Sequence, residues 1–526
     1  MTPAPTAQAR SPLGFPLFRA LWLATIVSNI GTWMHDVGAG WLMTSLSPSP
    51  LMVAMVQAAT TLPMFLLALP AGALADIVDR RRLLIAAQIL GLIAAAILAA
   101  LTWLGLTSPY VLLAATFVLG TAAALSAPVF QAIVPELVDK PALPDAVALN
   151  SLGVNIARAI GPALGGVIVA FAGTPAVFAL NALSVFAVLA VLIGWKRQPA
   201  AGALPPEHFI GALKAGVRYA RHAPALRLVL IRAVGFFLFG SALWAMLPLV
   251  ARRELGLDAA GYGALLGCMG AGAVIGALLL RRLRGRVATN VLSIGATVLF
   301  AGAALGLAAS HNPYVAGGVM VVAGLAWIGM LTSLNVAAQM AAPGWVKARA
   351  LAVYLLVFQG AMTGGSLLWG ALAARTDVAT ALMVAAAGQM LALILAVFWR
   401  LPAGEGADLS PSGHWAEPET SGAPHGDRPV MIEIEYRVAS DRVGEFVDAL
   451  RRFKTVRHRD GAIRWDVWED AAEPGRVIES FVVESWLEHQ RQHARVTNAD
   501  RVEQDLLNAF HQGEERPVVR HLLRPI

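Results

Sequence analysis

Residues 72–82 read Gly-Ala-Leu-Ala-Asp-Ile-Val-Asp-Arg-Arg-Arg, and residues 276–286, which lie 204 positions later, read Gly-Ala-Leu-Leu-Leu-Arg-Arg-Leu-Arg-Gly-Arg. In both stretches an apolar run ends in a cluster of arginines. The same offset aligns Gly31 with Gly235, Trp33 with Phe237, Pro109-Tyr110 with Pro313-Tyr314, Gly120 with Gly324, Ala146 with Ala350, Gly161 with Gly365 and Gly166 with Gly370. A constant offset indicates a duplicated unit. Secondary transporters are commonly built from duplicated helix sets, with substrate handled between them.

The composition places these repeats in a membrane. Hydrophobic residues make up 57% of the chain, charged residues only 14%, and the mean hydropathy is +0.64. Apolar runs of about 20 residues, enough to cross roughly 30 Å of hydrocarbon, predict helices at residues 17–45, 51–78, 83–106, 109–134, 146–172, 175–195, 225–250, 259–280, 288–309, 313–339, 350–374 and 378–399. We therefore expect an all-α membrane protein whose twelve transmembrane helices form two six-helix repeats, residues 1–196 and 224–401.

Lysine and arginine residues concentrate in alternate loops, and this predicts the orientation. The opposite loops contain only Arg252, Arg253 and Arg375. Because cytoplasmic loops carry the excess of positive charge, we expect a multi-pass protein of the cytoplasmic membrane with both termini in the cytoplasm. The net charge of +7 reflects this topology, so we do not expect nucleic-acid binding. The single Cys268 rules out a disulfide framework. The sequence contains no phosphate-binding loop, and we expect neither ATP hydrolysis nor a cofactor.

Three segments flank or join the repeats. Residues 197–223 contain a basic amphipathic helix, expected at the cytoplasmic surface, and residues 402–427 have the composition of a flexible linker. Residues 428–526 predict strands at 430–438, 463–468, 477–485 and 518–523, a helix after the first strand and another from Trp486 to about His511. This βαββαβ order is that of a ferredoxin-like α+β domain. Such sheets often leave one face for a second copy, so a homodimer through this domain stays open. We expect His489 and His493, four residues apart, on a solvated face rather than in a metal site.

The stretch quoted first also carries a motif. Gly72 permits close helix approach, Asp76 caps or faces a neighbouring helix N-terminus, and the arginines anchor the turn. The stretch resembles the signature loop of the major facilitator superfamily, Gly-x-Leu-Ala-Asp-Arg-x-Gly-Arg-Arg, except that Ile77 and Asp79 replace the first Arg and the second Gly. The resemblance implies that Gly72, Asp76 and Arg80 act as a conformational latch. The alternative is a basic loop that only fixes the topology.

The fifth predicted helix contains a second motif, Asn155-Ile-Ala-Arg158-Ala-Ile-Gly161-Pro162-Ala-Leu-Gly165-Gly166. Small residues four apart allow tight helix packing, and Pro162 bends the helix. Gly161, Pro162, Gly165 and Gly166 resemble the Gly-Pro-x-x-Gly-Gly signature of antiporter-type exporters, which implies export. Helix packing alone would also use these residues.

The first predicted helix places Asn29, Trp33, Asp36 and Gly40 on one face. A carboxylate at this depth is costly unless it faces a polar cavity or a partner, and desolvation favours its protonated form. We therefore expect Asp36 to bind a proton, and so to couple transport to protons, or to bind the cationic part of a substrate; the alternative is a hydrated acid near the outer mouth. Arg158 is a candidate for binding an anionic substrate, whereas Arg232 is expected to snorkel to the cytoplasmic interface. The candidates for the substrate cavity are Asn29, Trp33, Gln57, Gln131, Asn155, Arg158, Trp244, Trp327, Asn335 and Gln359; helix-packing hydrogen bonds would explain each of them as well.

Four short segments narrow the resemblance: Gly31-Thr32-Trp33-Met34 with Trp41-Leu42, Asn155-x-x-Arg158, Arg349-Ala350-Leu351 and Trp486-Leu-Glu-His489. Together they resemble the enterobactin-exporter-like branch, also described as transmembrane secretion effectors, although His35 departs from the expected glutamine. The resemblance implies export of siderophores and other small amphipathic molecules across the bilayer by proton antiport. The tail is similar to antibiotic-biosynthesis monooxygenases, and we expect a regulatory or dimerising module rather than an enzyme.

Three alternatives stay open at this point. One is an importer or facilitator of the same fold. Another is a membrane-anchored enzyme with its chemistry in residues 428–526. The third is a non-transporting scaffold or sensor, for which substitutions of cavity residues such as Arg158 would be silent.

Overall fold

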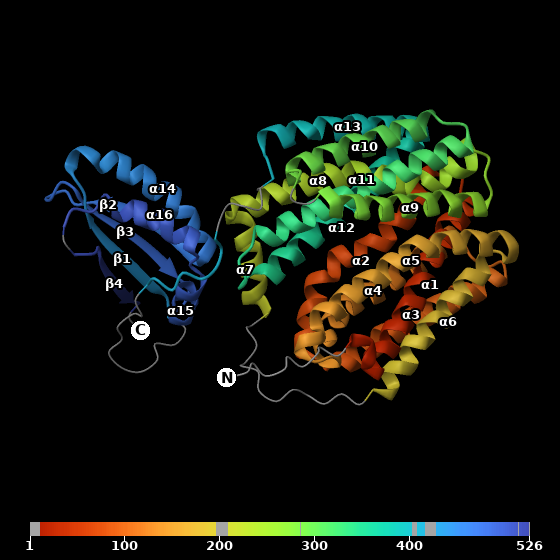
Figure 1. The fold of residues 1–526 in the computed structure, drawn as a ribbon, viewed down its shortest axis with the longest axis horizontal. Helices are drawn as coiled ribbons and strands as arrows, with labels where there is room; N and C mark the ends of the chain where they lie inside the picture. Colours follow the sequence, from red (N-terminus) through yellow and green to blue (C-terminus); the bar gives the residue numbers. More distant parts are fainter. Residues whose placement is uncertain are drawn as a thin grey trace, which may run out of the picture. The chain divides into compact units, whose positions relative to one another are not determined.

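The computed structural model describes residues 11–195, 209–283, 286–401, 408–415, 428–513 and 515–524. The chain divides into two compact units. The first unit comprises Met1–Pro206, Ile231–Leu334 and Leu355–Arg400, and the second comprises Glu207–Leu230, Asn335–Tyr354 and Leu401–Ile526. Figure 1 labels the helices and strands.

The first repeat is a six-helix bundle. Its helices are α1 Pro16–Leu46, α2 Pro50–Ile77, α3 Arg80–Trp103, α4 Pro109–Leu137, α5 Leu143–Ala172 and α6 Thr174–Gly194. Five of them carry a proline in the first turn, where its fixed φ suits the helix and its missing N–H costs nothing. The exception, α3, is capped by Asp79, whose Oδ1 accepts a hydrogen bond from the backbone N–H of Arg82 at 2.9 Å.

The second repeat follows the same plan. Its helices are α8 Pro224–Leu249, α9 Ala259–Leu283, α10 Thr289–Ala309, α11 Pro313–Met340, α12 Lys347–Arg375 and α13 Val378–Phe398, and a π-helical turn, Val250–Glu254, follows α8. The helices of both repeats begin and end within three residues of the predicted bounds. Among the described residues, ten helices are long and apolar enough to cross a membrane. α1 and α13 are not among these ten: Asn29, His35 and Asp36 interrupt the apolar run of α1, and the described apolar run of α13 is the shorter Val378–Ile394.

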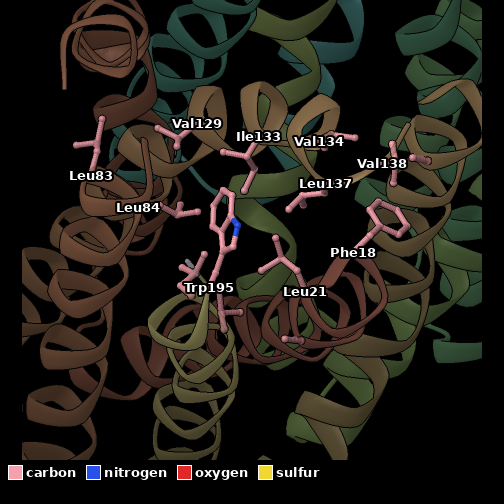
Figure 2. Packing of buried hydrophobic residues seen from close by; sticks show 14 of the residues in the cluster. Phe18, Leu21, Leu83, Leu84, Val129, Ile133, Val134, Leu137, Val138 and Trp195 are labelled. Carbon is pink, nitrogen blue, oxygen red and sulfur yellow. The ribbon is translucent and has the colours of Figure 1, made fainter. Parts of the chain in front are cut away.

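An apolar cluster fixes one end of the first repeat. Phe18 and Leu21 of α1 meet Leu84 of α3 and Ile133 of α4, and Trp195 closes the cluster just after α6 (Figure 2). Further along the bundle, α1 lies against α5 and α6, and α3 lies against α4 and α6. Each buried aliphatic or aromatic side chain of this kind contributes about 1.5–3 kcal/mol in water. In a membrane, close packing is what holds such helices together. The cluster therefore gives α1 a rigid support.

The tail contains a four-stranded antiparallel sheet of order β2-β3-β1-β4. The elements are β1 Val430–Arg437, α14 Val443–Asp460, β2 Ala462–Glu469, β3 Arg476–Val483, α15 Trp486–Arg495, α16 Asn498–Asn508 and β4 Val518–Leu523. α14 and α16 lie on one face of the sheet (Figure 1), where Phe446, Leu450 and Leu507 join its apolar core. The helical stretch predicted from Trp486 to about His511 contains two helices, α15 and α16. Thr497 and Asp500 form a capping box that begins a new helix.

The predicted amphipathic segment contains α7, Phe209–His222, which belongs to the second unit. Tyr219 is buried, and its hydroxyl donates to the carbonyl oxygen of Ala341 at 2.7 Å. Arg218 forms a 2.8 Å ion pair with Glu488 of α15. Within this unit, α7 therefore contacts both the segment between α11 and α12 and the tail.

Candidate functional site

A row of aromatic rings joins the two repeats. Trp33 of α1 lies 6.4 Å from Trp244 of α8 between ring centroids, Trp244 lies 5.3 Å from Trp327 of α11, and Trp327 lies 6.5 Å from Phe358 of α12. At the first-repeat end, the Arg158 Cζ atom of α5 lies 5.7 Å from the Trp33 ring centroid, within cation–π range. The structure thus brings together four residues that the sequence singled out and adds Phe358.

Two donors in this row have no acceptor. Among the residues that the structure describes, Arg158 Nε and Trp244 Nε1 are buried without a hydrogen-bond partner, and Arg158 forms no ion pair. A buried donor left unsatisfied costs about 1–3 kcal/mol. Groups of this kind are usually satisfied by water or by a bound molecule. The row therefore combines flat apolar surfaces with donors that suit an acceptor-bearing aromatic or amphipathic ligand.

Asp36 lies on the same face of α1 as Trp33, one turn further along. Its side chain is half-buried, and Gly40, one turn further along the same face, meets Tyr262 of α9 in the other repeat, where an added Cβ atom would lie 3.2 Å from Tyr262 Oη. Within the described parts of the chain, no basic side chain pairs with it. The neighbouring His35 is buried and packs against Phe178 of α6 in a tilted arrangement, with 4.8 Å between ring centroids. His35 therefore faces the interior of the first repeat, whereas Asp36 faces the second.

The remaining polar candidates divide into two groups. Asn29 is half-buried on α1, and Gln57 and Gln359 are half-buried one turn before Thr61 and Thr363, whose hydroxyl oxygens lie 2.7 Å apart and join α2 to α12. The other group lies apart from this contact. Gln131 is exposed on α4, Asn155 is exposed and donates to the Ser151 carbonyl of its own helix, and Asn335 belongs to the second compact unit.

Two arginines of the second repeat donate hydrogen bonds to the end of α1 and to the loop that follows it. Arg252 Nη1 donates to Thr44 Oγ1 at 2.8 Å and also to Ser45 Oγ. Arg253 Nη2 donates to the Pro48 carbonyl at 2.6 Å. In the sequence, these arginines stand out only as exceptions to the charge pattern of the loops. Sequence patterns could not predict their hydrogen bonds, because the bonds join positions more than two hundred residues apart.

The Gly-Pro motif of α5 faces both repeats. A Cβ atom at Gly161 would lie 2.5 Å from Trp33 Cβ, and one at Gly166 would lie 2.7 Å from Gly263 Cα of α9. Pro162 and Gly165 are also buried, and Gly165 faces Met34. The absence of side chains lets α5 contact α1 on one side and α9 on the other. The motif therefore sets the distance between the repeats beside Arg158.

The expected latch is described in part. Arg80 Nη1 donates to the Ala132 carbonyl at 3.2 Å and to Glu136 Oε1 at 3.0 Å, which ties α3 to the end of α4. Gly72 is half-buried within α2. The side chain of Asp76 lies outside the described residues. A role for these residues in switching thus stays a prediction.

Arg232 differs from the expectation. Only 4% of it is exposed, and its Nη1 and Nη2 atoms donate to Asn290 Oδ1 at 3.3 Å and to Ser293 Oγ at 2.9 Å, both on α10. The side chain therefore lies between helices instead of snorkelling to the interface. The two polar residues on α10 supply hydrogen-bond acceptors, which reduce the free-energy cost of burying the guanidinium.

The tail contains a buried polar network. Arg457 and Glu479 form a bidentate ion pair with two 3.0 Å hydrogen bonds, and Trp465 Nε1 also donates to Glu479. His489 is buried, with its Nε2 atom 3.3 Å from His493 Nε2, so the expected solvated face was wrong for His489. Burial, together with the neighbouring His493, lowers the pKa of His489 to about 3. In the described residues, no group of three or more His, Cys, Asp or Glu side chains is arranged to hold a metal.

Curated relatives include a staphyloferrin A transporter and an enterobactin exporter. Over 165 residues the chain is 33% identical to the staphyloferrin A transporter of Staphylococcus aureus, covering 31% of this chain and 41% of that protein. Less than half of that relative is therefore matched. The enterobactin exporter EntS of Salmonella typhimurium is 27% identical over 332 residues, covering 61% of this chain and 76% of that protein.

Solved structures show the same fold. A POT family transporter in complex with 5-aminolevulinic acid matches with a TM-score of 0.60 at 13% identity, covering 73% of this chain and 96% of that one. A bacterial homologue of the human lysosomal transporter Spinster, in an inward-facing and unoccupied conformation, matches with a TM-score of 0.57 at 14% identity, covering 73% and 95%. The model of the transmembrane secretion effector family matches residues 7–526. The chain therefore belongs to the transmembrane secretion effectors, a family of major facilitator superfamily transporters.

Proposed function

We propose that this protein is a secondary active exporter of small amphipathic molecules, of siderophore or drug-like type, driven by proton antiport. The observation that carries the proposal is the row of rings from Trp33 to Phe358, which begins at Arg158 and crosses between the repeats. Its two unpaired donors suit the oxygen acceptors of such molecules. The names of the relatives, a staphyloferrin A transporter and an enterobactin exporter, support a siderophore-type substrate.

Alternating access would follow from rocking of the two repeats around this row. We propose twelve membrane crossings with both termini in the cytoplasm, as the loop charges predict. In that orientation Arg252 and Arg253 tie the repeats together at the outer surface. Breaking these bonds, together with the Thr61–Thr363 contact, would accompany opening to the outside. The glycines of α5 would provide a smooth surface for this movement, and Gly72, Asp76 and Arg80 the latch.

We assign proton coupling to Asp36. It faces the second repeat, has no cationic partner in the described structure and lies one turn from Trp33. A carboxylate in such a position changes its protonation when solvent access changes, because desolvation favours the neutral acid. Protonation from the outside would release substrate, and deprotonation to the inside would reset the carrier.

The tail would act as a regulatory or dimerising module of ferredoxin-like type. Large apolar side chains are exposed on the face of the sheet opposite its helices, among them Trp468 of β2 and Val518 and Leu522 of β4. A second copy of the sheet would cover such a surface. An importer of the same fold stays a second candidate. An enzyme or sensor in the tail stays a third, favoured by the buried histidines of α15.

The deciding experiment measures proton flux in inverted vesicles when siderophores, macrolides and lipophilic cations are added in turn. We expect one compound class to drive proton movement out of the vesicle lumen, and Asp36→Asn to abolish it. Asp139→Asn, which changes an exposed acid between α4 and α5, is the matched control and should retain the flux. Full coupling in Asp36→Asn would refute the assignment of Asp36.

Two further outcomes would overturn the proposed function itself. Proton movement in the opposite direction would favour the importer. A change in the mass of the added compound, followed by mass spectrometry of the same samples, would favour an enzyme in the tail.

A further inference from the structure

An apolar groove of about 540 Å³ runs between α8 and α13 in the second repeat. Val234 and Leu238 of α8 line one wall, Leu391 and Ile394 of α13 line the other, and Gly235 and Gly388 contribute bare backbone. Val234, Leu391 and Ile394 are also strongly exposed. The volume lies within the range of roughly 300–1,000 Å³ that small-molecule sites occupy. On the surface of a membrane helix pair, such a groove is accessible to lipid.

A buried cation lies at the wall of this groove. Arg232 lines a small cavity of about 10 Å³, and Gly235 and Ala392 line both this cavity and the groove. The two acceptors of the guanidinium, Asn290 and Ser293, are neutral. Among the residues that the structure describes, no carboxylate pairs with Arg232. The positive charge is therefore solvated by dipoles but not neutralised.

An unneutralised charge within a membrane segment is costly and generally marks a binding function. Arginine presents five N–H donors, and within the described part of the chain Arg232 forms two hydrogen bonds to side chains. The planar guanidinium matches the oxygens of a phosphate group. A ligand with a phosphate and a long apolar chain would satisfy the cation and fill the groove at the same time.

The first repeat has the corresponding helices, but at the described positions that match this site it lacks the arginine, its two acceptors and the groove. At the offset of 204 residues, Ser28 stands in place of Arg232, Ala86 in place of Asn290 and Ile89 in place of Ser293. The corresponding helix pair, α1 and α6, is closed where Gly31 meets Ser184. The cation, its two acceptors and the groove occur together in one repeat, which is what a specific site predicts.

We propose that the groove between α8 and α13 binds an anionic phospholipid, with an acyl chain in the groove and the phosphate held by Arg232. The lipid would be a structural partner of the second repeat, bound on the surface away from the aromatic row. This proposal does not depend on the direction of transport or on proton coupling.

Native mass spectrometry of the purified full chain tests the proposal. The protein is titrated with dioleoylphosphatidylglycerol and, separately, with dioleoylphosphatidylethanolamine. We expect tighter binding of the anionic lipid, and about tenfold weaker binding of that lipid to Arg232→Gln, because a tenfold change corresponds to about 1.4 kcal/mol. Arg232→Lys should keep most of the preference. Arg281→Gln, which removes an exposed charge of the same repeat, should bind as the wild type does.

A second variant tests the groove without touching the charge. Ala392→Phe fills the groove and should lose both lipids, whereas Leu183→Phe, on the exposed surface of α6, should lose neither. Thermal unfolding of each variant in detergent shows that it is folded. If Arg232→Gln does not fold, Ala392→Phe decides alone.

Three results would overturn the proposal. The first is an unchanged preference for the anionic lipid in folded Arg232→Gln. The second is retention of both lipids by Ala392→Phe. The third is displacement of the bound lipid by inorganic phosphate alone, which would identify a free-anion site instead of a lipid site.

Discussion

The two repeats share a backbone plan but carry opposite chemistry. The charges beside the aromatic row, Asp36 and Arg158, lie in the first repeat, and most of the rings lie in the second. At the offset of 204 residues, Asp36 corresponds to Gly240, Arg158 to Met362, Trp244 to Gly40, Trp327 to Ala123 and Phe358 to Val154. Duplication therefore fixed the helix positions and left the side chains free to diverge. A ligand that needs both charge and stacking must contact both repeats, and this couples its binding to their relative movement.

Packing differs between the repeats in the same way. α1 and α6 meet closely because Gly31 leaves room for Ser184. At the corresponding positions of the second repeat, Gly235 and Gly388 line the groove, and Gly388 also leaves room for Phe239 of α8. Small residues thus serve close helix contact in both repeats, and in the second they also border a surface recess. The same residue type at the same position has no single structural meaning.

The largest effect is expected when the charge at position 158 is replaced by the residue that stands at the corresponding position of the second repeat. Arg158→Met introduces the residue that stands at position 362. If Arg158 holds an anionic group, its loss removes a charge-assisted hydrogen bond of about 1.5–3 kcal/mol, or roughly 10- to 150-fold in apparent affinity. Substrate-driven proton flux at increasing substrate concentration measures this as a rise in KM.

Arg158→Lys is the matched control, since it keeps the charge but loses the planar donors, and it should fall between wild type and Arg158→Met. An unchanged KM in Arg158→Met, with protein of normal abundance in the vesicles, would show that the charge division between the repeats is not functional. It would also favour the scaffold or sensor alternative.

The architecture was accessible from the sequence because its signals are periodic and strong. Runs of apolar residues set off by proline, as at Pro109 and Pro313, placed the helix ends within three residues. Trp33, Arg158, Trp244 and Trp327 were singled out by residue type and predicted depth, and the structure brings them together. Residue type was informative for Arg158 because charged side chains are rare in membrane helices and generally face the interior of the bundle.

The placement of the other candidates could not be predicted, for a physical reason. Gln131, Asn155 and Asn335 have the right chemistry, but the direction of a side chain depends on helix rotation and tilt, which packing decides. The hydrogen bonds of Arg252 and the burial of Arg232 depend on distant helices in the same way. Residues of an interface become visible only when the elements that flank it are in place.

An intermediate effect, on stability, is expected when the close contact between Gly31 of α1 and Ser184 of α6 is disturbed. In Gly31→Ala the new Cβ atom would overlap Ser184 Oγ, and overpacking of this kind costs about 1–3 kcal/mol. Ser184→Gly gives position 184 the residue found at 388, and the double variant should recover most of the loss. Thermal unfolding in detergent measures each variant. Gly295→Ala, where nothing lies within 4 Å of the added atom, should not destabilise. Equal melting temperatures for Gly31→Ala and Gly295→Ala would contradict the close contact of α1 and α6.

The smallest effect concerns a single donor in the second repeat. Trp244→Phe keeps an aromatic ring in the row but removes the unpaired Nε1 donor, so a substrate that accepts from it should lose about 0.5–1.5 kcal/mol, or roughly 2- to 12-fold in KM. Trp369→Phe is the informative comparison, because Trp369 Nε1 already donates to the Leu238 carbonyl at 2.7 Å within the protein. Its loss should lower the melting temperature and leave KM unchanged. If Trp244→Phe instead leaves KM unchanged and raises stability, Trp244 Nε1 is only an unsatisfied donor. The second repeat would then contribute apolar surface alone, which would sharpen the division of chemistry between the two repeats.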